Sequence, residues 1–114
     1  MAEQAELTRP ENSTEKLQTV NPATGQPGKS YDPDSIETAR AAAKAAHAAF
    51  RDWRRTSFAD RSAVVHKAAE ILRGRTDELA RLMTEEMGKT LDDGHAEVEK
   101  CAFHCDWFAD HAEG

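Results

Sequence analysis

The chain has 114 residues, of which 39% are hydrophobic and 32% are charged, and its formal net charge at pH 7 is -6. This length fits one small domain, and the negative charge argues against a nucleic-acid partner, because phosphate binding needs clustered Lys and Arg. No apolar run approaches the roughly 20 residues of a membrane-spanning helix, and no signal-peptide pattern opens the sequence. The two cysteines make no disulfide framework, so we expect a cytoplasmic protein without membrane or nucleic-acid partners.

The beginning of the chain is polar and shows no apolar period. Residues 1–18 are therefore predicted to be a disordered leader, and residues 19–114 the folded domain. This domain opens with residues 21–25, NPATG, where Asn-Pro and a following Gly are typical of a turn. A strand could follow, but Pro27 and Gly28 interrupt the place where it would run, so a turn or a weak strand is expected.

Four helices follow, predicted from their caps and from their apolar periodicity. Asp34 is the expected cap of the first helix, and Ser57 or Thr56 that of the second. Gly74 and Gly88 are expected to end the second and third helices. The predicted spans are residues 34–54, 57–73, 76–87 and 93–112.

Apolar side chains recur three or four residues apart in each predicted helix, which gives each helix one apolar face. The four faces are Ile36, Ala39, Ala43, Ala46, Phe50 and Trp53; Val64, Val65, Ala68, Ile71 and Leu72; Leu79, Leu82, Met83 and Met87; and Val98, Cys101, Ala102, Cys105, Phe108, Ala109 and Ala112. Alanine favours a helix but buries little apolar area. The composition therefore predicts a mostly helical fold that is marginal unless a partner surface covers these faces.

Cysteine and histidine form the sharpest cluster of reactive side chains. Cys101 and Cys105 lie one helical turn apart with His104 at the edge of the same face, and all three residue types bind zinc. Structural zinc usually takes ligands from two segments, however, and free cysteines are common in protein cores. A reactive thiolate is the second option, but both thiols lie on the apolar face. Inert core thiols are the favoured interpretation.

Two further patterns have simpler explanations than chemistry. Residues 88–90, GKT, are like the end of a phosphate-binding loop, but that motif's first glycine is absent and the segment follows a helix rather than a strand. The pairs Glu85-Glu86 and Asp92-Asp93 could supply a general acid and base, although adjacent helical residues point in different directions. Asp93 is interpreted as a stabilising charge at a helix start.

The remaining candidates are single residues within predicted helices. His47 and His66 occur in polar stretches and are interpreted as solvated side chains. Met83 and Met87 lie one turn apart on an apolar face and are interpreted as core residues. The sequence thus assigns no catalytic, cofactor-binding or metal-binding residue.

Several segments match one known family in order and spacing. They are residues 21–25 (NPATG), 48–54 (AAFRDWR), 77–80 (DELA), 84–89 (TEEMGK), 96–102 (AEVEKCA) and 108–113 (FADHAE). Over about residues 19–114 they resemble the N-terminal part of the NAD(P)-dependent aldehyde dehydrogenases, and the succinate-semialdehyde dehydrogenase branch is the most similar. Between Gly25 and Asp34 the chain departs from the family, which generally has an alternating apolar strand there.

The resemblance implies the N-terminal helical part of an α/β fold, and a chemistry whose residues come later in the family's sequence. In such enzymes a cysteine thiolate attacks the aldehyde, hydride passes to NAD or NADP, and a glutamate helps water to release the acid. Cys101 and Cys105 match helix positions rather than that nucleophile. The resemblance therefore carries no catalytic or cofactor residue onto this chain, and NAD or NADP is implied only for a full-length relative.

Two functional hypotheses follow. The first is a truncated aldehyde dehydrogenase that is inactive by itself and belongs to a family that oxidises aldehydes, with succinate semialdehyde as the candidate substrate. The alternative is a non-catalytic helical module for interaction or oligomerisation. In either case the expected partner is a second copy or a full-length aldehyde dehydrogenase, bound through exposed apolar helix faces.

Overall fold

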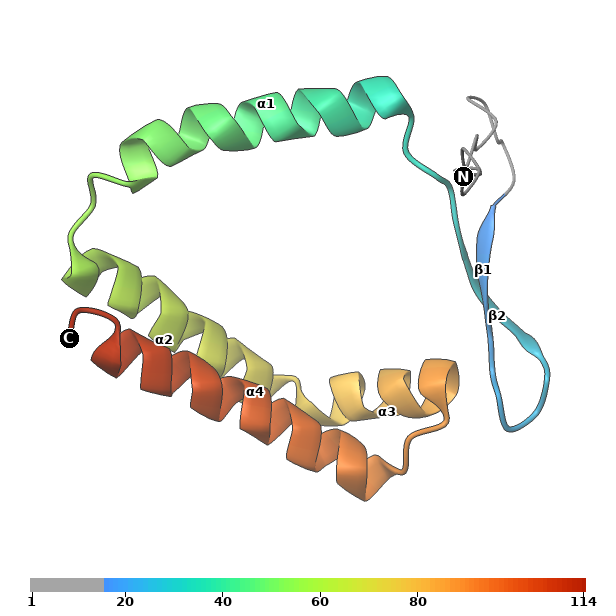
Figure 1. Cartoon of the computed structure of the whole chain (residues 1–114). Helices are drawn as coiled ribbons and strands as arrows, with labels where there is room; N and C mark the ends of the chain where they lie inside the picture. Colours follow the sequence, from blue (N-terminus) through green and yellow to red (C-terminus); the bar gives the residue numbers. More distant parts are fainter. Residues whose placement is uncertain (1–15) are drawn as a thin grey trace, which may run out of the picture.

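The chain forms a small hairpin followed by four helices (Figure 1). A computed structural model describes residues 16–114. The elements are β1 (Leu17–Val20), β2 (Pro27–Tyr31), α1 (Ile36–Trp53), α2 (Phe58–Gly74), α3 (Thr76–Met87) and α4 (Leu91–His111). The predicted mostly helical fold is confirmed, with helix boundaries within two residues of those expected. No helix in this part of the chain combines the length and the apolar character needed to cross a membrane.

The hairpin starts earlier than the sequence indicated. Leu17 and Gln18 were assigned to the leader, which is wrong, because they pair with Tyr31 and Ser30 in an antiparallel sheet. Strand β1 has only four residues and is largely exposed, so it carries no apolar alternation that could predict it. Residues 1–15, the rest of the predicted leader, lie outside the described residues.

Strand β2 forms despite its proline and glycine. Pro27 is its first residue, a position where a strand tolerates the missing N–H. Gly28 faces Thr19, where the register of the sheet is irregular, and a Cβ at position 28 would lie 2.4 Å from the Thr19 hydroxyl oxygen. That hydroxyl accepts a hydrogen bond of 2.9 Å from the Lys29 amide. The expected weak strand therefore forms, and Gly28 lets Thr19 of the partner strand approach closely.

The turn between the strands follows the predicted chemistry. The Asn21 side-chain oxygen accepts hydrogen bonds from the amides of Ala23 at 2.9 Å and Thr24 at 3.2 Å. Gly25 has a φ of +70°, the left-handed region that glycine adopts without strain. The turn at residues 21–25 is confirmed.

The first two helices begin at side-chain caps. Ser35 caps α1 by accepting a hydrogen bond from the Thr38 amide at 3.1 Å, so the predicted cap at Asp34 is wrong by one residue. Both residue types cap helices, and the pattern alone does not choose between neighbours. Ser57 caps α2 as predicted, and with Asp60 it forms a capping box.

The connection between α3 and α4 is also defined by local chemistry. Gly88 ends α3 with a φ of +72°, as expected, and a Cβ there would lie 2.9 Å from Pro22 in the hairpin turn. Thr90 caps α4 by accepting a hydrogen bond from the Asp93 amide at 3.2 Å. Because Thr90 is the cap, α4 starts at Leu91, two residues before the predicted start.

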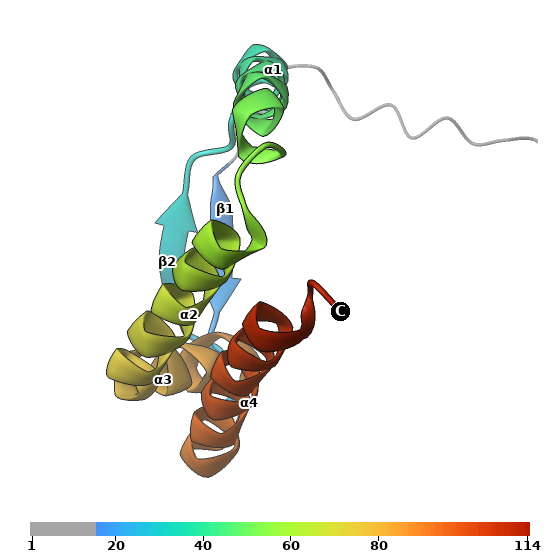
Figure 2. The ribbon, with the colours of Figure 1, turned by 90° about the vertical axis from the view of Figure 1, so that its left-hand side faces the viewer.

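Helix α4 packs along α2 and across α3, and this contact holds the only fully buried residues of the described chain (Figures 1 and 2). The buried residues are Ala69, Ala80, Gly94, Val98 and Ala102. A Cβ on Gly94 would lie 3.0 Å from both the Cα and the Cβ of Ala80. Small side chains therefore bring the backbones together, and a single valine supplies the largest buried side chain.

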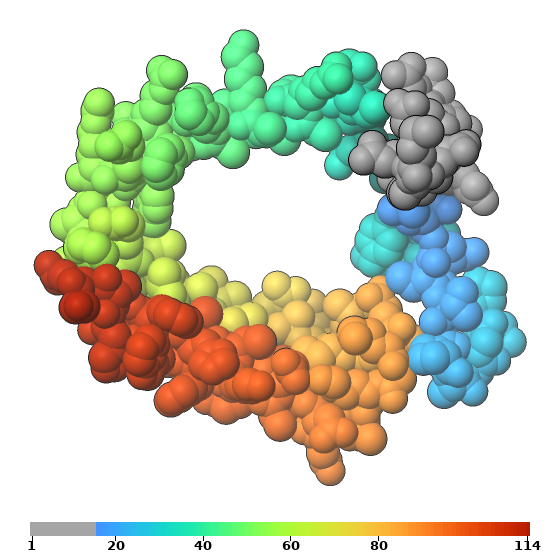
Figure 3. All heavy atoms as spheres, viewed as in Figure 1, coloured from blue at the N-terminus to red at the C-terminus, as the bar shows by residue number. Residues whose placement is uncertain are grey.

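Most of the predicted apolar faces are not buried. Helix α1 has no buried residue, and Phe50 and Trp53 are 51% and 43% exposed. In α2 the buried residue is Ala69 rather than the predicted Ala68. Figure 3 shows an opening between α1 and the layer of α2, α3 and α4. The periodicity located the helices, but it did not say which faces this part of the chain covers.

The assignment of both methionines to the core is wrong for Met87. This residue, the last of α3, is 73% exposed, whereas Met83 is half-buried. Helix α3 contacts α4 through Ala80 and ends at Gly88, so Met87 extends beyond the contact.

The close approach of α3 and α4 can be tested by adding one methyl group. Gly94→Ala should lower the free energy of unfolding by about 1–3 kcal/mol, because the added Cβ overpacks the contact with Ala80. Gly74→Ala is the matched control: nothing lies within 4 Å of its added Cβ, and it should be neutral or slightly stabilising. Urea unfolding followed by circular dichroism measures both. Equal effects of the two variants would contradict the close approach.

Candidate functional site

The structure does not assemble the candidate zinc ligands. Cys101 and His104 are exposed, and Cys105 is half-buried. Among residues 16–114, no group of three His, Cys, Asp or Glu side chains is placed to hold a metal ion. The interpretation of both cysteines as core thiols is wrong for Cys101, because α4 turns Val98 and Ala102 inward and leaves Cys101 at the margin of that face.

The segment that is similar to a phosphate-binding loop has structural roles. Gly88 ends α3, Lys89 forms an ion pair of 3.0 Å with Glu97, and Thr90 caps α4. The hydrogen bond from Lys89 lowers the pKa of the Glu97 carboxyl. The Thr90 hydroxyl also donates to the Asp93 carboxylate at 2.7 Å, so Asp93 supports the start of the helix as expected.

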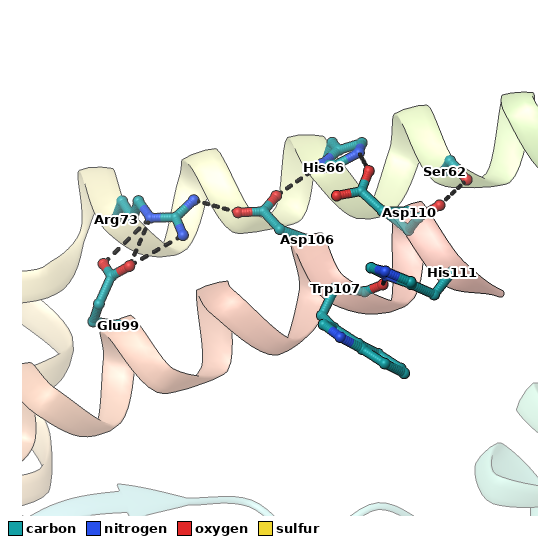
Figure 4. A network of polar contacts seen from close by, with 9 residues as sticks. Ser62, His66, Arg73, Glu99, Asp106, Trp107, Asp110 and His111 are labelled. Carbon is teal, nitrogen blue, oxygen red and sulfur yellow. Dashed lines mark hydrogen bonds and ion pairs between the residues drawn. The ribbon is translucent and has the colours of Figure 1, made fainter.

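The strongest polar site joins α2 to α4 and centres on His66 (Figure 4). Its Nδ1 lies 2.8 Å from Asp106 Oδ1, and its Nε2 lies 3.0 Å from Asp110 Oδ1. The interpretation of His66 as a solvated side chain is therefore wrong. The sequence held no signal for these pairs, because the partners are 40 and 44 residues away.

Arg73 extends the same network toward the start of α4. Its guanidinium donates to both carboxylate oxygens of Glu99 at 3.1 and 3.2 Å, and to Asp106 Oδ2 at 2.7 Å. Asp106 thus bridges His66 and Arg73, and the hydrogen bonds from these two groups lower its pKa. The hydrogen bond to Glu99 raises the pKa of Arg73 most, and the hydrogen bond to Asp106 raises it further. The Asp106 carboxylate therefore stays ionised down to lower pH than an isolated one.

The two helices also share a neutral hydrogen bond. The Ser62 hydroxyl of α2 donates to the Ala109 carbonyl of α4 at 2.6 Å. A His–Asp pair beside a serine is the arrangement that activates a nucleophile, but that serine must hydrogen-bond to the histidine. Ser62 uses its proton on the backbone, so the network joins helices rather than activating a nucleophile.

Two other histidines of α4 also have partners. The His95 Nε2 lies 2.9 Å from Asp77 Oδ1 of α3. The His111 ring stacks on Trp107 at a centroid distance of 4.5 Å, and its Nδ1 lies 2.7 Å from the Trp107 carbonyl oxygen. These contacts fix the His95 and His111 side chains along α4.

The described residues do not fit a nicotinamide dinucleotide. Binding of its pyrophosphate needs a glycine-rich turn between a parallel strand and the start of a helix. The sheet of residues 16–114 is an antiparallel hairpin, and β2 leads into α1 through residues 32–35, DPDS, without glycine. We therefore assign no cofactor contact to these residues.

An apolar hollow lies at the C-terminal end of α1. It is lined by Ala46, Ala49, Phe50, Asp52, Trp53 and Thr56. Two aromatic rings and two alanines form most of this wall, and one carboxylate and one hydroxyl lie among them. Such a surface suits an apolar side chain of a packed neighbour better than a charged ligand.

Comparison with known proteins gives one consistent result. The family model described as "Aldehyde dehydrogenase family" matches residues 8–114. A probable succinate-semialdehyde dehydrogenase [NADP(+)] of Synechocystis is 43% identical over 97 residues, and succinate-semialdehyde dehydrogenase [NADP(+)] 1 of Mycobacterium tuberculosis is 40% identical. These matches cover 85% of this chain and 21% of each relative. The chain therefore spans about a fifth of the length of the curated relatives it matches.

A solved structure agrees with the sequence matches. Succinic semialdehyde dehydrogenase from Streptococcus pyogenes, in complex with NADP+ as the cofactor, superposes with a TM-score of 0.79 at 32% identity. The superposition covers 84% of this chain and 21% of that enzyme. The hairpin and helices thus have the arrangement of the N-terminal part of an aldehyde dehydrogenase fold.

The network between α2 and α4 predicts a salt-sensitive loss of stability. Arg73→Met should lower the urea midpoint, because it leaves Glu99 without its guanidinium partner and Asp106 with His66 alone. The effect should shrink in about 1 M NaCl, since these groups are partly exposed and salt screens them. Arg75→Met is the control: its partner Glu78 lies on the first turn of α3, so that pair joins no two helices. An effect of Arg75→Met as large as that of Arg73→Met would contradict the interhelical role.

Proposed function

The chain belongs to the aldehyde dehydrogenase family, and from this premise we propose that it serves as the N-terminal helical scaffold of an enzyme that oxidises succinate semialdehyde with NADP+. The observation that carries this proposal is the match of 85% of the chain to relatives named for that substrate and cofactor. The expected compartment is the cytoplasm.

The first support is the open arrangement of the helices. Helix α1 lies apart from α2, α3 and α4 and has no buried residue. In an isolated chain, packing the apolar face of α1 against those helices would lower the free energy, because it would remove apolar surface from water. The same arrangement superposes on a complete enzyme with a TM-score of 0.79. We therefore infer that another folded part occupies the opening seen in Figure 3, and that this part is the rest of an aldehyde dehydrogenase fold.

The second support is the amount of uncovered apolar surface. Large side chains are exposed on every helix, among them Phe50 and Trp53 on α1, Val64 and Ile71 on α2, and Phe108 on α4. A stable monomer of this size rarely leaves so many large apolar side chains in water. Covering them with another part of the fold would supply the hydrophobic stabilisation that the small core lacks.

We further propose that these 114 residues do not catalyse the oxidation by themselves. The reaction needs a nucleophile, a base and a cofactor site. Cys101 and Cys105 lie on α4, and the sheet of the described residues is an antiparallel hairpin rather than a dinucleotide cradle. The contribution of this segment is to position and cover the elements that carry those groups.

A hybrid enzyme tests the scaffold role. Residues 16–114 would replace the matching segment of the Streptococcus pyogenes enzyme, and the hybrid should reduce NADP+ with succinate semialdehyde. The chain alone should give no turnover above a no-protein control. A folded hybrid without activity, or turnover by the chain alone, would overturn the proposal.

The alternative function is a helical module that assembles with itself, and the exposed apolar side chains of α1 favour it. Light scattering combined with circular dichroism separates the two functions. A cooperative homo-oligomer of the isolated chain would support the module. A monomer that gains cooperative unfolding only within the hybrid would support the scaffold.

The apolar face of α1 gives a mutational prediction. Trp53→Ala should destabilise the hybrid by about 3–5 kcal/mol, because the ring would be buried there, and should leave the helix content of the isolated chain nearly unchanged. Lys44→Ala, on the opposite face of α1, is the matched control and should be nearly neutral in both proteins. Thermal unfolding of the four variant proteins measures the effects. Equal stability of the two hybrid variants would contradict burial of Trp53.

A further inference from the structure

The contacts of His66 constrain its protonation. Both ring nitrogens face carboxylate oxygens, Nδ1 toward Asp106 at 2.8 Å and Nε2 toward Asp110 at 3.0 Å. An ionised carboxylate only accepts hydrogen bonds, so each nitrogen must donate a proton to satisfy its contact. A neutral imidazole has one N–H and would turn a lone pair toward one of the carboxylates. The geometry therefore requires the imidazolium form.

The position of these contacts gives them a specific mechanical role. The last fully buried residue of α4 is Ala102, so the segment 103–111 is held without a fully buried side chain. The contacts that join this segment to α2 include those of His66 with Asp106 and Asp110, the ion pair of Arg73 with Asp106, and the hydrogen bond from Ser62 to Ala109. The C-terminal half of α4 thus depends on polar contacts more than the N-terminal half does.

We propose that protonated His66 is a clamp that holds the C-terminal half of α4 on α2, and that loss of one proton from its ring loosens this half, which then keeps only its contacts with Arg73 and Ser62. The ring joins two carboxylates that lie one helical turn apart on α4. Deprotonation removes one of the two N–H donors and the positive charge together. The N-terminal half of α4 stays packed through Gly94, Val98 and Ala102.

The charges around His66 favour the clamp. Asp106 and Asp110 face it from α4, and on its own helix Arg73 reaches the far oxygen of Asp106. Glu99 balances the charge of Arg73, and Lys67 of α2 pairs with Glu70 on the same helix. No cation contacts the ring itself within residues 16–114. The pKa of His66 is raised above its ordinary 6.5, and the largest cause is the hydrogen bond with Asp106. Desolvation, the next largest cause, lowers this pKa, and the hydrogen bond with Asp110 raises it.

The sign of the pH dependence follows from these shifts. A raised pKa in the folded state means that the clamp contributes fully below pH 6.5, the ordinary pKa, and is lost as pH rises through the folded-state value. At acid pH the relevant group is Asp106, whose pKa is lowered from its ordinary value of 3.8. Its contribution to stability is full above pH 3.8 and is lost as pH falls through the lowered pKa. The attachment should therefore be strongest between these two transitions.

A histidine titration followed by NMR tests the clamp in the full chain. The imidazole signal of His66 should titrate above pH 6.5, and Asp110→Asn should lower that midpoint, because Asp110 contacts only His66 in the network. Amide hydrogen exchange, corrected for its intrinsic pH dependence, should become faster in residues 103–111 than in residues 94–102 as His66 deprotonates. His66→Gln should show the fast exchange at every pH, since a side-chain amide cannot donate in both directions.

The control is His47→Gln, which removes an exposed histidine from α1 and should leave the exchange of residues 103–111 unchanged. A His66 midpoint that Asp110→Asn does not move would overturn the proposal. Equal exchange of residues 103–111 in His66→Gln and in the unchanged chain would also overturn it. Neither result depends on dehydrogenase activity, so the scaffold function and the clamp can fail separately.

Discussion

The close contact of α4 with α2 and α3 is the constraint on which the described fold depends. Gly94 lies so near Ala80 that even a methyl group would be too close, and the other buried side chains are alanines and one valine. Small residues allow the helix backbones to approach, but they bury little apolar area. This contact therefore sets the geometry of the three helices without supplying much hydrophobic stabilisation.

The stabilisation that the small core does not supply has two sources, one within the described chain and one that requires a neighbour. Between α2 and α4, charged groups of both helices form a connected network around Asp106. On α1, and on the outer faces of the other helices, large apolar side chains remain in water. The charged network has its partners within the described chain, whereas the exposed apolar side chains would be buried only against a neighbour. A scaffold segment of a larger fold would have this division, because its own contacts fix its shape and its uncovered faces fit what surrounds it.

Membership in the aldehyde dehydrogenase family accounts for the arrangement of the hairpin and the helices. The curated relatives are far longer than the segment that matches this chain. Cys101 and Cys105, the residues that first suggested a reactive site, both lie on α4, where Cys101 is exposed and Cys105 is half-buried. The substrate and the cofactor are therefore proposed for a whole enzyme that contains this segment, and they are not assigned to residues of this chain.

The features that could be predicted from the sequence are those that local interactions determine. Ser57 with Asp60, the turn at residues 21–25 and the stop at Gly88 were predictable, because caps, turns and left-handed glycines involve residues only a few positions apart. The order of motifs also identified the family. Three features became visible only in the three-dimensional fold: the existence of β1, the exposure of α1, and the contacts of His66 with Asp106 and Asp110. These features depend on which segments meet across tens of residues, and neither periodicity nor capping carries that information.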